Sequence, residues 1–576
     1  MLVSLLILLQ LLCNAVYTSN PCAEIGSSYV KLGKKQDPPS GYISTSVDLL
    51  GRLLQVREKA SAKVYLSQYD FDSDIRYLIS RANDGHLNIN LCSMGIMHFE
   101  HGVPLVSISS DGLQLPKIYS YYDAEAKLHG TVASVSPVYQ IEGMDPVYYL
   151  QANIGVTIGL QDPDARYNHL FPSPPAAFAG EYTGGAWTNN LGSWPGTGSQ
   201  TLEFINGTKL TVETTASLPL DNLWDFSNGS SLFQTACERQ MKTSSVKLHP
   251  RVPSRSFPYT IPLGGPSMYP LPVERQRKDL MRVPTFKLDG ERPNSFGQTA
   301  VEFIRKAIRD GKSKLIIDLS SNNGGDMNIG FNLFRIFFPE KPIYTATRFQ
   351  TTELIDLMGQ VFSSPQGMKA IGEDSLDLPL ISEKAVSPDH RQSFSTWDDL
   401  YGPVTFPNAN MSHLHATFNF TTASTIDNPI SGFGEYSAPL TQPFKAQNII
   451  VMTNGRCAST CAILASLLKR QGARSIATTA NNTDSPILSA KKLARLAELA
   501  PPPLNELPLI ITTHGGGGVN FRNEYGEDDS QTPLQFVGEA ADCRLFFTAE
   551  NYIAPESSWV AAAEAMFGNA SCEVDG

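Results

Sequence analysis

The sequence has few charged residues and contains no long block of charge of one sign. Charged residues account for 18% of its 576 positions, and the formal net charge is −11. Nucleic-acid-binding domains gather lysine and arginine, so this pattern argues against a nucleic-acid partner. Glycine and proline, at 44 and 39 residues, stay close to average usage, which excludes a collagen-like or wholly disordered chain. The length suggests roughly three or four folding units.

Long apolar runs are absent after the first residues, since no later segment approaches the length of about 20 residues that crosses a bilayer. Leu2–Leu12 is almost wholly apolar, and Cys13-Asn14-Ala15 supplies a small-residue cleavage pattern typical of a secretory signal peptide. A positively charged n-region is missing, so a buried N-terminal strand is the alternative. We predict a signal peptide over residues 1–19, no membrane span, and a mature protein that is secreted or lies in the lumen of the secretory pathway.

Cysteine is scarce, with 8 residues in the whole chain. Removal of Cys13 with the signal peptide leaves an odd number of cysteines. At least one thiol therefore stays free or pairs with a second chain, and a homodimer is one of the assemblies that we consider. No set of histidine, cysteine and carboxylate side chains has metal-ligand spacing, so we expect neither a metal nor another cofactor. N-glycosylation sequons, which support secretion only weakly, begin at Asn206, Asn228, Asn410, Asn419, Asn481 and Asn569.

Changes in composition divide the chain into regions. Residues 20–110 are mainly helical, with helices expected over Ser46–Arg57 and Phe71–Ala82 and a short strand over Leu87–Cys92. Residues 111–165 alternate as a strand through Thr131–Gln140. Residues 170–275 are rich in Gly, Pro, Ser and Thr and predict a β-rich insertion with long loops.

Residues 280–576 alternate between strands and helices. Lys314–Leu319 is a mostly apolar run of the kind that a parallel strand covered on both faces requires. The loop Ser321–Gly325 and a helical pattern follow it, and Asn448–Met452 repeats the same order before the helix Thr460–Arg470. Two such units predict an α/β layer with active loops at the carboxyl ends of its strands. Residues 350–435 between them look loop-like and inserted.

Ser459 stands where the second of these strands passes into a helix. Backbone N–H groups and the positive end of the helix dipole at that point stabilise an oxyanion. The loop Asn323-Gly324-Gly325 can aim further N–H groups into the same crevice if the two strands are neighbours. Taken alone, Ser459 could be an ordinary N-cap and the two glycines an ordinary turn.

A serine nucleophile needs a base, and the chain offers 10 histidines. His86, in Asp84-Gly85-His86, is one candidate among several. His413 and His415 lie in a polar stretch that we expect to be exposed. His514 precedes Gly515–Gly518, which superficially resembles the oxyanion segment of lipases, but the chain has no G-x-S-x-G elbow.

The ordered set of motifs resembles the C-terminal-processing, or tail-specific, serine peptidase family. The resemblance is closest to a fungal branch related to chlamydial protease-like activity factor. Its elements here are Asp84-Gly85-His86, the strand Leu315–Leu319 with its glycine loop, Gly455–Ala462, and Phe536–Arg544. They occur in the family's order. The resemblance implies a crotonase/ClpP-like mixed α/β core with an N-terminal helical region, a β-rich insertion and, at residues 111–165, a PDZ-like module.

The resemblance also implies roles for individual residues. Ser459 would be the nucleophile, His86 the general base and Glu539 the carboxylate that orients it, although Glu524, Asp528 and Asp542 compete nearby. Backbone amides of Thr460, Gly324 and Gly325 would form the oxyanion hole. Bacterial members use a lysine base instead. Lys491 and Lys492 lie further after Ser459 than the lysine of those members does, which disfavours a Ser-Lys dyad.

This chain differs from the family at one segment. Thr478–Thr483 stands where the family has glycines that frame the pocket. A helix is expected after it, over Lys491–Leu499. We therefore expect a secreted serine endopeptidase that cleaves proteins or ribosomally made precursor peptides of a fungal secondary-metabolite pathway. The main alternative is an inactive homologue that binds a hydrophobic ligand or peptide. A lipase or esterase using His514 is a further alternative.

Overall fold

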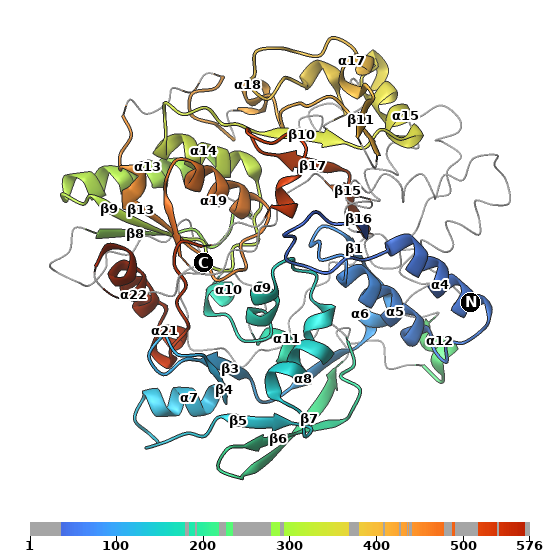
Figure 1. Ribbon diagram of the computed structural model, residues 1–576, viewed down its shortest axis with the longest axis vertical. Helices are drawn as coiled ribbons and strands as arrows, with labels where there is room; N and C mark the ends of the chain where they lie inside the picture. The colour runs from blue at the N-terminus through green and yellow to red at the C-terminus, as the bar shows by residue number, and fades with distance from the viewer. Residues whose placement is uncertain are drawn as a thin grey trace.

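The protein is described here by a computed structural model (Figure 1). The described residues are 36–178, 184–189, 193–217, 226–233, 278–287, 293–367, 380–406, 409–425, 428–434, 436, 441–476, 487–489, 517–537, 541–568 and 570. The predicted signal peptide at residues 1–19 and the predicted helix Lys491–Leu499 lie outside them. Within the described part of the chain, no helix is both long and apolar enough to span a membrane.

A four-stranded parallel sheet forms the centre of the C-terminal region. Its strands stand in the order β14 (Arg474–Ile476), β13 (Ile449–Met452), β9 (Lys314–Asp318) and β8 (Lys278–Arg282). The register places Met452 opposite Asp318, so β9 and β13 are direct neighbours and end at the same edge. This confirms the predicted pair of strand–loop–helix units.

Alternate residues of the central strands face two different helical layers. Ile317 and Val451 pack with α13 (Pro293–Arg309), α14 (Met327–Phe337) and α19 (Thr460–Arg470). Ile316 and Ile450 pack instead against α22 (Pro555–Phe567). Figure 1 shows α22 on the opposite side of the sheet from α14 and α19. Burial on both faces explains why these strands are nearly continuous apolar runs.

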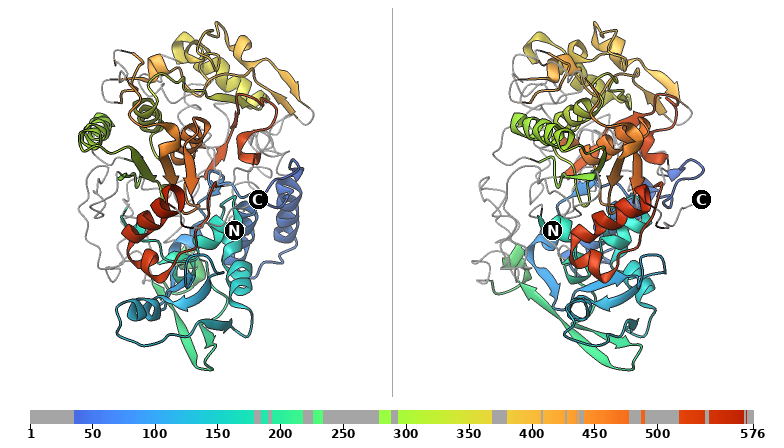
Figure 2. Two further views of the ribbon diagram at one scale, coloured as in Figure 1. Left: turned by 60° about the vertical axis from the view of Figure 1, so that its left-hand side comes forward. Right: turned by 90° about the vertical axis from the view of Figure 1, so that its left-hand side faces the viewer.

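A second sheet is antiparallel and lies at the opposite end of the molecule from the described part of residues 350–435 (Figure 2). Its order is β2 (His98–His101), β7 (Lys209–Ser217), β6 (Ser199–Phe204) and β5 (Val138–Ile141), and α8 (Pro146–Asn153) follows β5. Because β5 pairs with β6, the sheet crosses the boundary placed near residue 170 between the PDZ-like module and the β-rich insertion. The predicted strand Thr131–Gln140 is wrong in its first part, since the ladder with β6 begins at Val138.

Among the described N-terminal residues, two helices that pack against each other precede a very short strand. The helices α4 (Leu49–Ser61) and α5 (Gln68–Ser80) confirm the two predicted ones, and the Ser67 side chain caps α5. The strand β1 (Asn88–Ile89) is shorter than predicted because α6 (Cys92–Ile96) begins at once. It pairs with β16 (Gly517–Asn520), so residues near His86 lie beside the C-terminal part of the chain.

The prediction that residues 350–435 are loop-like is wrong where the described residues form helices and short strands, and it holds for the rest of the described residues there. Residues Leu354, Ile355, Met358 and Phe362 are buried on one face of α15 (Glu353–Phe362). They pack with Trp397 in a small core of their own. Short apolar groups separated by polar stretches concealed this periodicity. The other elements are α17 (Trp397–Tyr401), β11 (Val404–Phe406), β12 (Ala409–Met411) and α18 (Phe420–Ala423).

Candidate active site

Ser459 precedes the first residue of α19 and has an unusual backbone. Its φ is 61° and its ψ −132°, a region that residues with a Cβ rarely enter and that costs roughly 1–3 kcal/mol. The side chain makes no capping hydrogen bond to the helix. The alternative that Ser459 is an ordinary N-cap therefore does not hold, because a capping serine is extended and bonds the first turn.

The Ser459 side chain lies against Gly324 at the end of β9. A Cβ atom at Gly324 would stand 2.6 Å from the Ser459 Oγ and 2.8 Å from the Ala458 carbonyl oxygen. Gly324 also has a φ of 91°. Both the close approach and the backbone conformation require glycine here. The glycine loop of one strand and the serine of the next thus meet, as neighbouring strands predict.

The amides at this junction are not equivalent. The Gly324 N–H donates to Asn322 Oδ1 at 2.8 Å and is occupied, so it does not suit the oxyanion hole predicted from the sequence. Gly325 forms a parallel bridge to Phe286, in which the groups of Gly324 and Asp326 on either side make the bonds. The N–H and C=O of the middle residue in such a bridge face away from the partner. The Gly325 carbonyl accepts the Thr460 hydroxyl at 2.8 Å, so its N–H faces the same side.

Thr460 supplies the second amide. It is the first residue of α19, and the first N–H groups of a helix have no partner within the helix. The positive end of the helix dipole lies at the same place. Gly325 and Thr460 are therefore the two amides that suit an oxyanion beside Ser459.

Buried asparagines hold the two loops together, and sequence reasoning missed them. The Asn322 carbonyl oxygen accepts the Ala458 N–H at 3.1 Å, and its Nδ2 donates to the Val283 carbonyl at 2.8 Å. Asn454 Oδ1 accepts the Ser321 N–H, and its Nδ2 donates to Ser321 Oγ, both at 2.8 Å. The available signal was an asparagine shortly after each of the two strands.

Two cysteines flank the serine, and Cys457 is disulfide-bonded to Cys461. A disulfide leaves neither cysteine a thiolate with which to bind zinc. Among the described residues, no group of three or more histidine, cysteine or acidic side chains could hold a metal ion.

His86 lies in the turn between α5 and β1 and is half-buried. Its backbone N–H donates to Asp84 Oδ1 at 3.1 Å. The Asp84 carboxylate is buried and accepts from Asn520 Nδ2 at 3.0 and 3.1 Å. Asn520 belongs to β16, so the turn is fixed to the same strand that pairs with β1.

One short helix, α9 (Pro163–Asn168), contacts both the His86 turn and the serine loop. Arg166 Nη1 donates to Asn83 Oδ1 at 3.1 Å, three residues before His86. Asn168 Nδ2 donates to the carbonyl oxygen of Asn454 at 3.0 Å. A helix of 6 residues is about 9 Å long. The two segments that carry His86 and Ser459 are therefore brought to one small region.

Glu539 lies outside the described residues, and its neighbours on both sides can be placed. The Phe536 ring packs on Tyr42 with centroids 5.1 Å apart. Burial raises the pKa of Tyr42, and so does the charge of Asp84, which lies nearby. On the far side, the Asp542 N–H donates to the Ser475 carbonyl oxygen in β14 at 3.1 Å. The segment that contains Glu539 therefore starts beside the His86 turn and ends at the central sheet.

Each of the three competing acids lies among the described residues. Glu524 is buried in β17 (Arg522–Tyr525), opposite Thr347 of β10 (Ala346–Phe349). Asp542 accepts the Ser475 N–H at 2.7 Å, and Asp528 is exposed.

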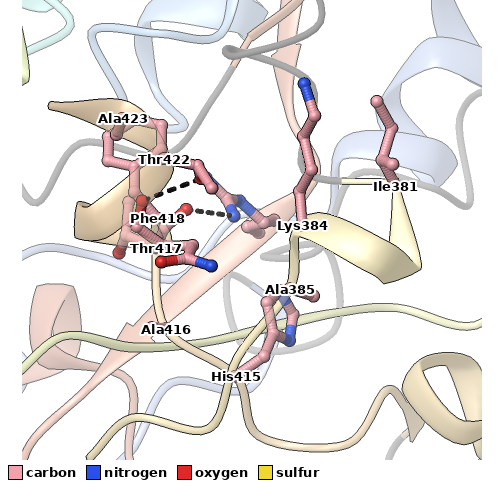
Figure 3. Close-up of a pocket in the computed structure, with 11 residues that line it drawn as sticks. Ile381, Lys384, Ala385, His415, Ala416, Thr417, Phe418, Thr422 and Ala423 are labelled. Carbon is pink, nitrogen blue, oxygen red and sulfur yellow. Dashed lines mark hydrogen bonds between the residues drawn. The ribbon is translucent and has the colours of Figure 1, made fainter. Parts of the chain in front are cut away.

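The expectation that His415 is exposed is wrong, whereas His413 is exposed. Burial, and then the nearby Arg522 charge, lower the pKa of His415 to about 3. His415 lines a pocket with Lys384 and Arg522 (Figure 3). Its volume of ≈ 30 Å³ suits one water molecule rather than a peptide side chain. His514 lies outside the described residues.

Comparison with known proteins identifies the family. The model of the CPAF-like PDZ domain matches residues 98–222, and that of peptidase family S41 matches residues 280–484. The peptidase S41 family protein ustP of Aspergillus flavus is 57% identical over 470 residues, which cover 72% of this chain and 98% of that protein. The peptidase S41 family protein phomP1 of Diaporthe leptostromiformis is 40% identical, and 96% of this chain and 94% of that protein are covered.

Solved structures agree on the fold. Mature CPAF complexed with lactacystin is 14% identical and has a TM-score of 0.53, covering 94% of this chain and 96% of that chain. The fold is that of a serine peptidase with a PDZ-like domain, as the motifs predicted. The chain belongs to peptidase family S41.

Proposed function

We propose that the chain is a secreted serine endopeptidase that cleaves protein or precursor-peptide substrates through an acyl-enzyme, with Ser459, His86 and Glu539 as its catalytic residues. The observation that carries the proposal is the backbone of Ser459. A buried serine held at a positive φ, with its Oγ against Gly324 beside two amides, has no capping role and suits nucleophilic attack.

The proposed reaction assigns a role to each of these groups. Ser459 Oγ attacks the scissile carbonyl while His86 takes its proton, and His86 then passes the proton to the leaving amine. The amides of Gly325 and Thr460 stabilise the oxyanion of each tetrahedral intermediate. Water attacks the acyl-enzyme in the second half of the cycle, again with His86 as base. Glu539 orients the imidazole and stabilises its charged form.

The substrate class rests on the family and on the second sheet. A PDZ-like domain binds an extended peptide by adding it as a strand to a sheet edge. Asn189 already pairs with Glu100 on the outer side of β2, which limits strand addition at that position. Similarity to the fungal proteins supports a ribosomally made precursor peptide of a fungal secondary-metabolite pathway as the substrate.

Secretion is supported by the apolar leader and by the sequons. Asn206, Asn228 and Asn410 are exposed and would accept a glycan, whereas Asn419 is half-buried and caps α18. Asn481 and Asn569 lie outside the described residues. Expression of the full chain in a fungal host, followed by assay of the medium and glycosidase treatment, tests the proposal, which fails if the protein stays unglycosylated inside the cell.

Labelling with an active-site fluorophosphonate tests the catalytic proposal. Wild-type protein should be modified at Ser459, and Ser459→Ala should not react. A correctly folded wild type that neither reacts nor cleaves any peptide would favour a binding protein for a hydrophobic ligand or peptide. Loss of ester turnover in His514→Ala, with His86→Ala unaffected, would favour the lipase alternative.

A further inference from the structure

The disulfide on either side of Ser459 takes no part in the proposed reaction. Cys457 and Cys461 stand two residues on either side of Ser459, and their Cα atoms are 5.3 Å apart. Both are buried, at 2% and 0% exposure. Cys461 lies in the first turn of α19, whereas Cys457 belongs to the loop after β13. The bond therefore ties the loop to the helix across the serine.

The backbone at this serine needs to be held. At a φ of 61° an L-residue is strained, and such a conformation persists only where the surroundings fix it from several sides. Hydrogen bonds fix both flanks, since the Ala458 N–H reaches Asn322 and the Thr460 hydroxyl reaches Gly325. The disulfide adds a covalent closure around the same turn.

We propose that the Cys457–Cys461 disulfide is a positioning element that holds Ser459 in its reactive conformation, so that catalysis requires its oxidised form. This inference rests on the proposed function. Reduction converts the bond to two thiols with two electrons and two protons from a dithiol, which is itself oxidised to a disulfide. An oxidising compartment such as the secretory pathway keeps the bond formed.

The short ring separates positioning from global stability. A disulfide stabilises a fold mainly by restricting the unfolded chain, and the effect grows with the length of the closed loop. The separation here is 4 residues, so the contribution to stability is small. Displacement of a nucleophile by about 1 Å can cost about 100-fold in rate. Loss of the bond should therefore lower kcat strongly, whereas the melting temperature should change little.

The experiment compares wild type with the double variant Cys457→Ala/Cys461→Ala in full-length protein. The matched control is Cys543→Ala, which removes a buried cysteine outside the ring. We expect the double variant to lose about 100-fold in kcat and in the rate of fluorophosphonate labelling, with KM within about twofold. The control should keep both rates. Dithiothreitol should inhibit wild type, and reoxidation should restore it.

Wild-type kcat and labelling in the double variant would overturn the proposal, as would losses that match its unfolded fraction. If the double variant does not fold, reduction and reoxidation decide, carried out on the wild type and on Cys92→Ala, because Cys92 is also disulfide-bonded. Unchanged labelling of the reduced protein overturns the proposal. Failure of the oxidised wild type to react at Ser459 would instead overturn the proposed function.

Discussion

The serine loop and the histidine turn are built in different ways. Ser459 is enclosed by the carboxyl ends of two central strands, and buried asparagines bond the loops around it. His86 is half-buried and precedes a strand of only 2 residues. The proposed nucleophile and its two amides are therefore preorganised by the core. The proposed base lies on a peripheral segment, which α9 and β16 hold near them.

The largest expected effect is removal of the nucleophile. Ser459→Ala should lower kcat by about 10⁴-fold or more, because the acyl-enzyme can no longer form. Ser459→Gly should be equally inactive but more stable than Ser459→Ala, since glycine adopts a positive φ without strain. Peptide hydrolysis and thermal unfolding of the two variants measure both effects. Equal stability would show that the loop is not strained.

Loss of the base should come next. We expect His86→Ala to lower kcat by about 10³-fold with little change in KM, since a general base acts in the transition state. Wild-type activity should rise with pH through the histidine range, near about 6.5, and a midpoint near the lysine value of about 10.4 would contradict this base. A His86→Ala variant with wild-type turnover would remove the turn from the mechanism.

Gly324→Ala tests the contact between the two strands. A Cβ would stand 2.6 Å from Ser459 Oγ, so we expect the serine to be displaced and kcat to fall by about 100-fold. Gly311→Ala is the matched control, because Gly311 also has a positive φ, of 69°, but nothing within 4 Å. Both variants carry backbone strain. Only Gly324→Ala should lose fluorophosphonate labelling, and equal losses would contradict the steric account.

The smallest effect lies outside both segments and concerns stability rather than rate. The pKa of His415 is lowered to about 3, so the unfolded chain binds more protons than the native one below about pH 6.5. The contribution of His415 to the free energy of unfolding is fully present above that pH and is lost as the pH falls. In wild type this histidine should cost about 2 kcal/mol of stability between about pH 7 and pH 5, and His415→Gln should abolish that part of the pH dependence.

Denaturant unfolding at the two pH values measures this change. His413→Gln, at the exposed histidine nearby, is the matched control. If the two variants behave alike, burial of His415 does not set the acid sensitivity.

The sequence predicted the parts of the site that depend on local pattern. The apolar runs over β9 and β13, the helix after Ser459 and the glycine loop are local features, and α19 has the predicted bounds. The hydrogen bond from the Gly324 N–H to Asn322 Oδ1 could not be foreseen, because it depends on the orientation of one side chain in the folded loop. The burial of His415 depends on a strand pairing that brings Thr347 beside it from a distant part of the sequence.

The central claim is that Ser459, His86 and Glu539 share one pocket with two amides. A crystal structure of the fluorophosphonate adduct tests it most directly. We predict a bond from phosphorus to Ser459 Oγ, a phosphoryl oxygen about 2.7–3.1 Å from the Gly325 and Thr460 nitrogens, and the His86 imidazole within hydrogen-bond reach of both the adduct and Glu539. An adduct on another residue, or a His86 ring that faces away from an adduct on Ser459, would contradict the account.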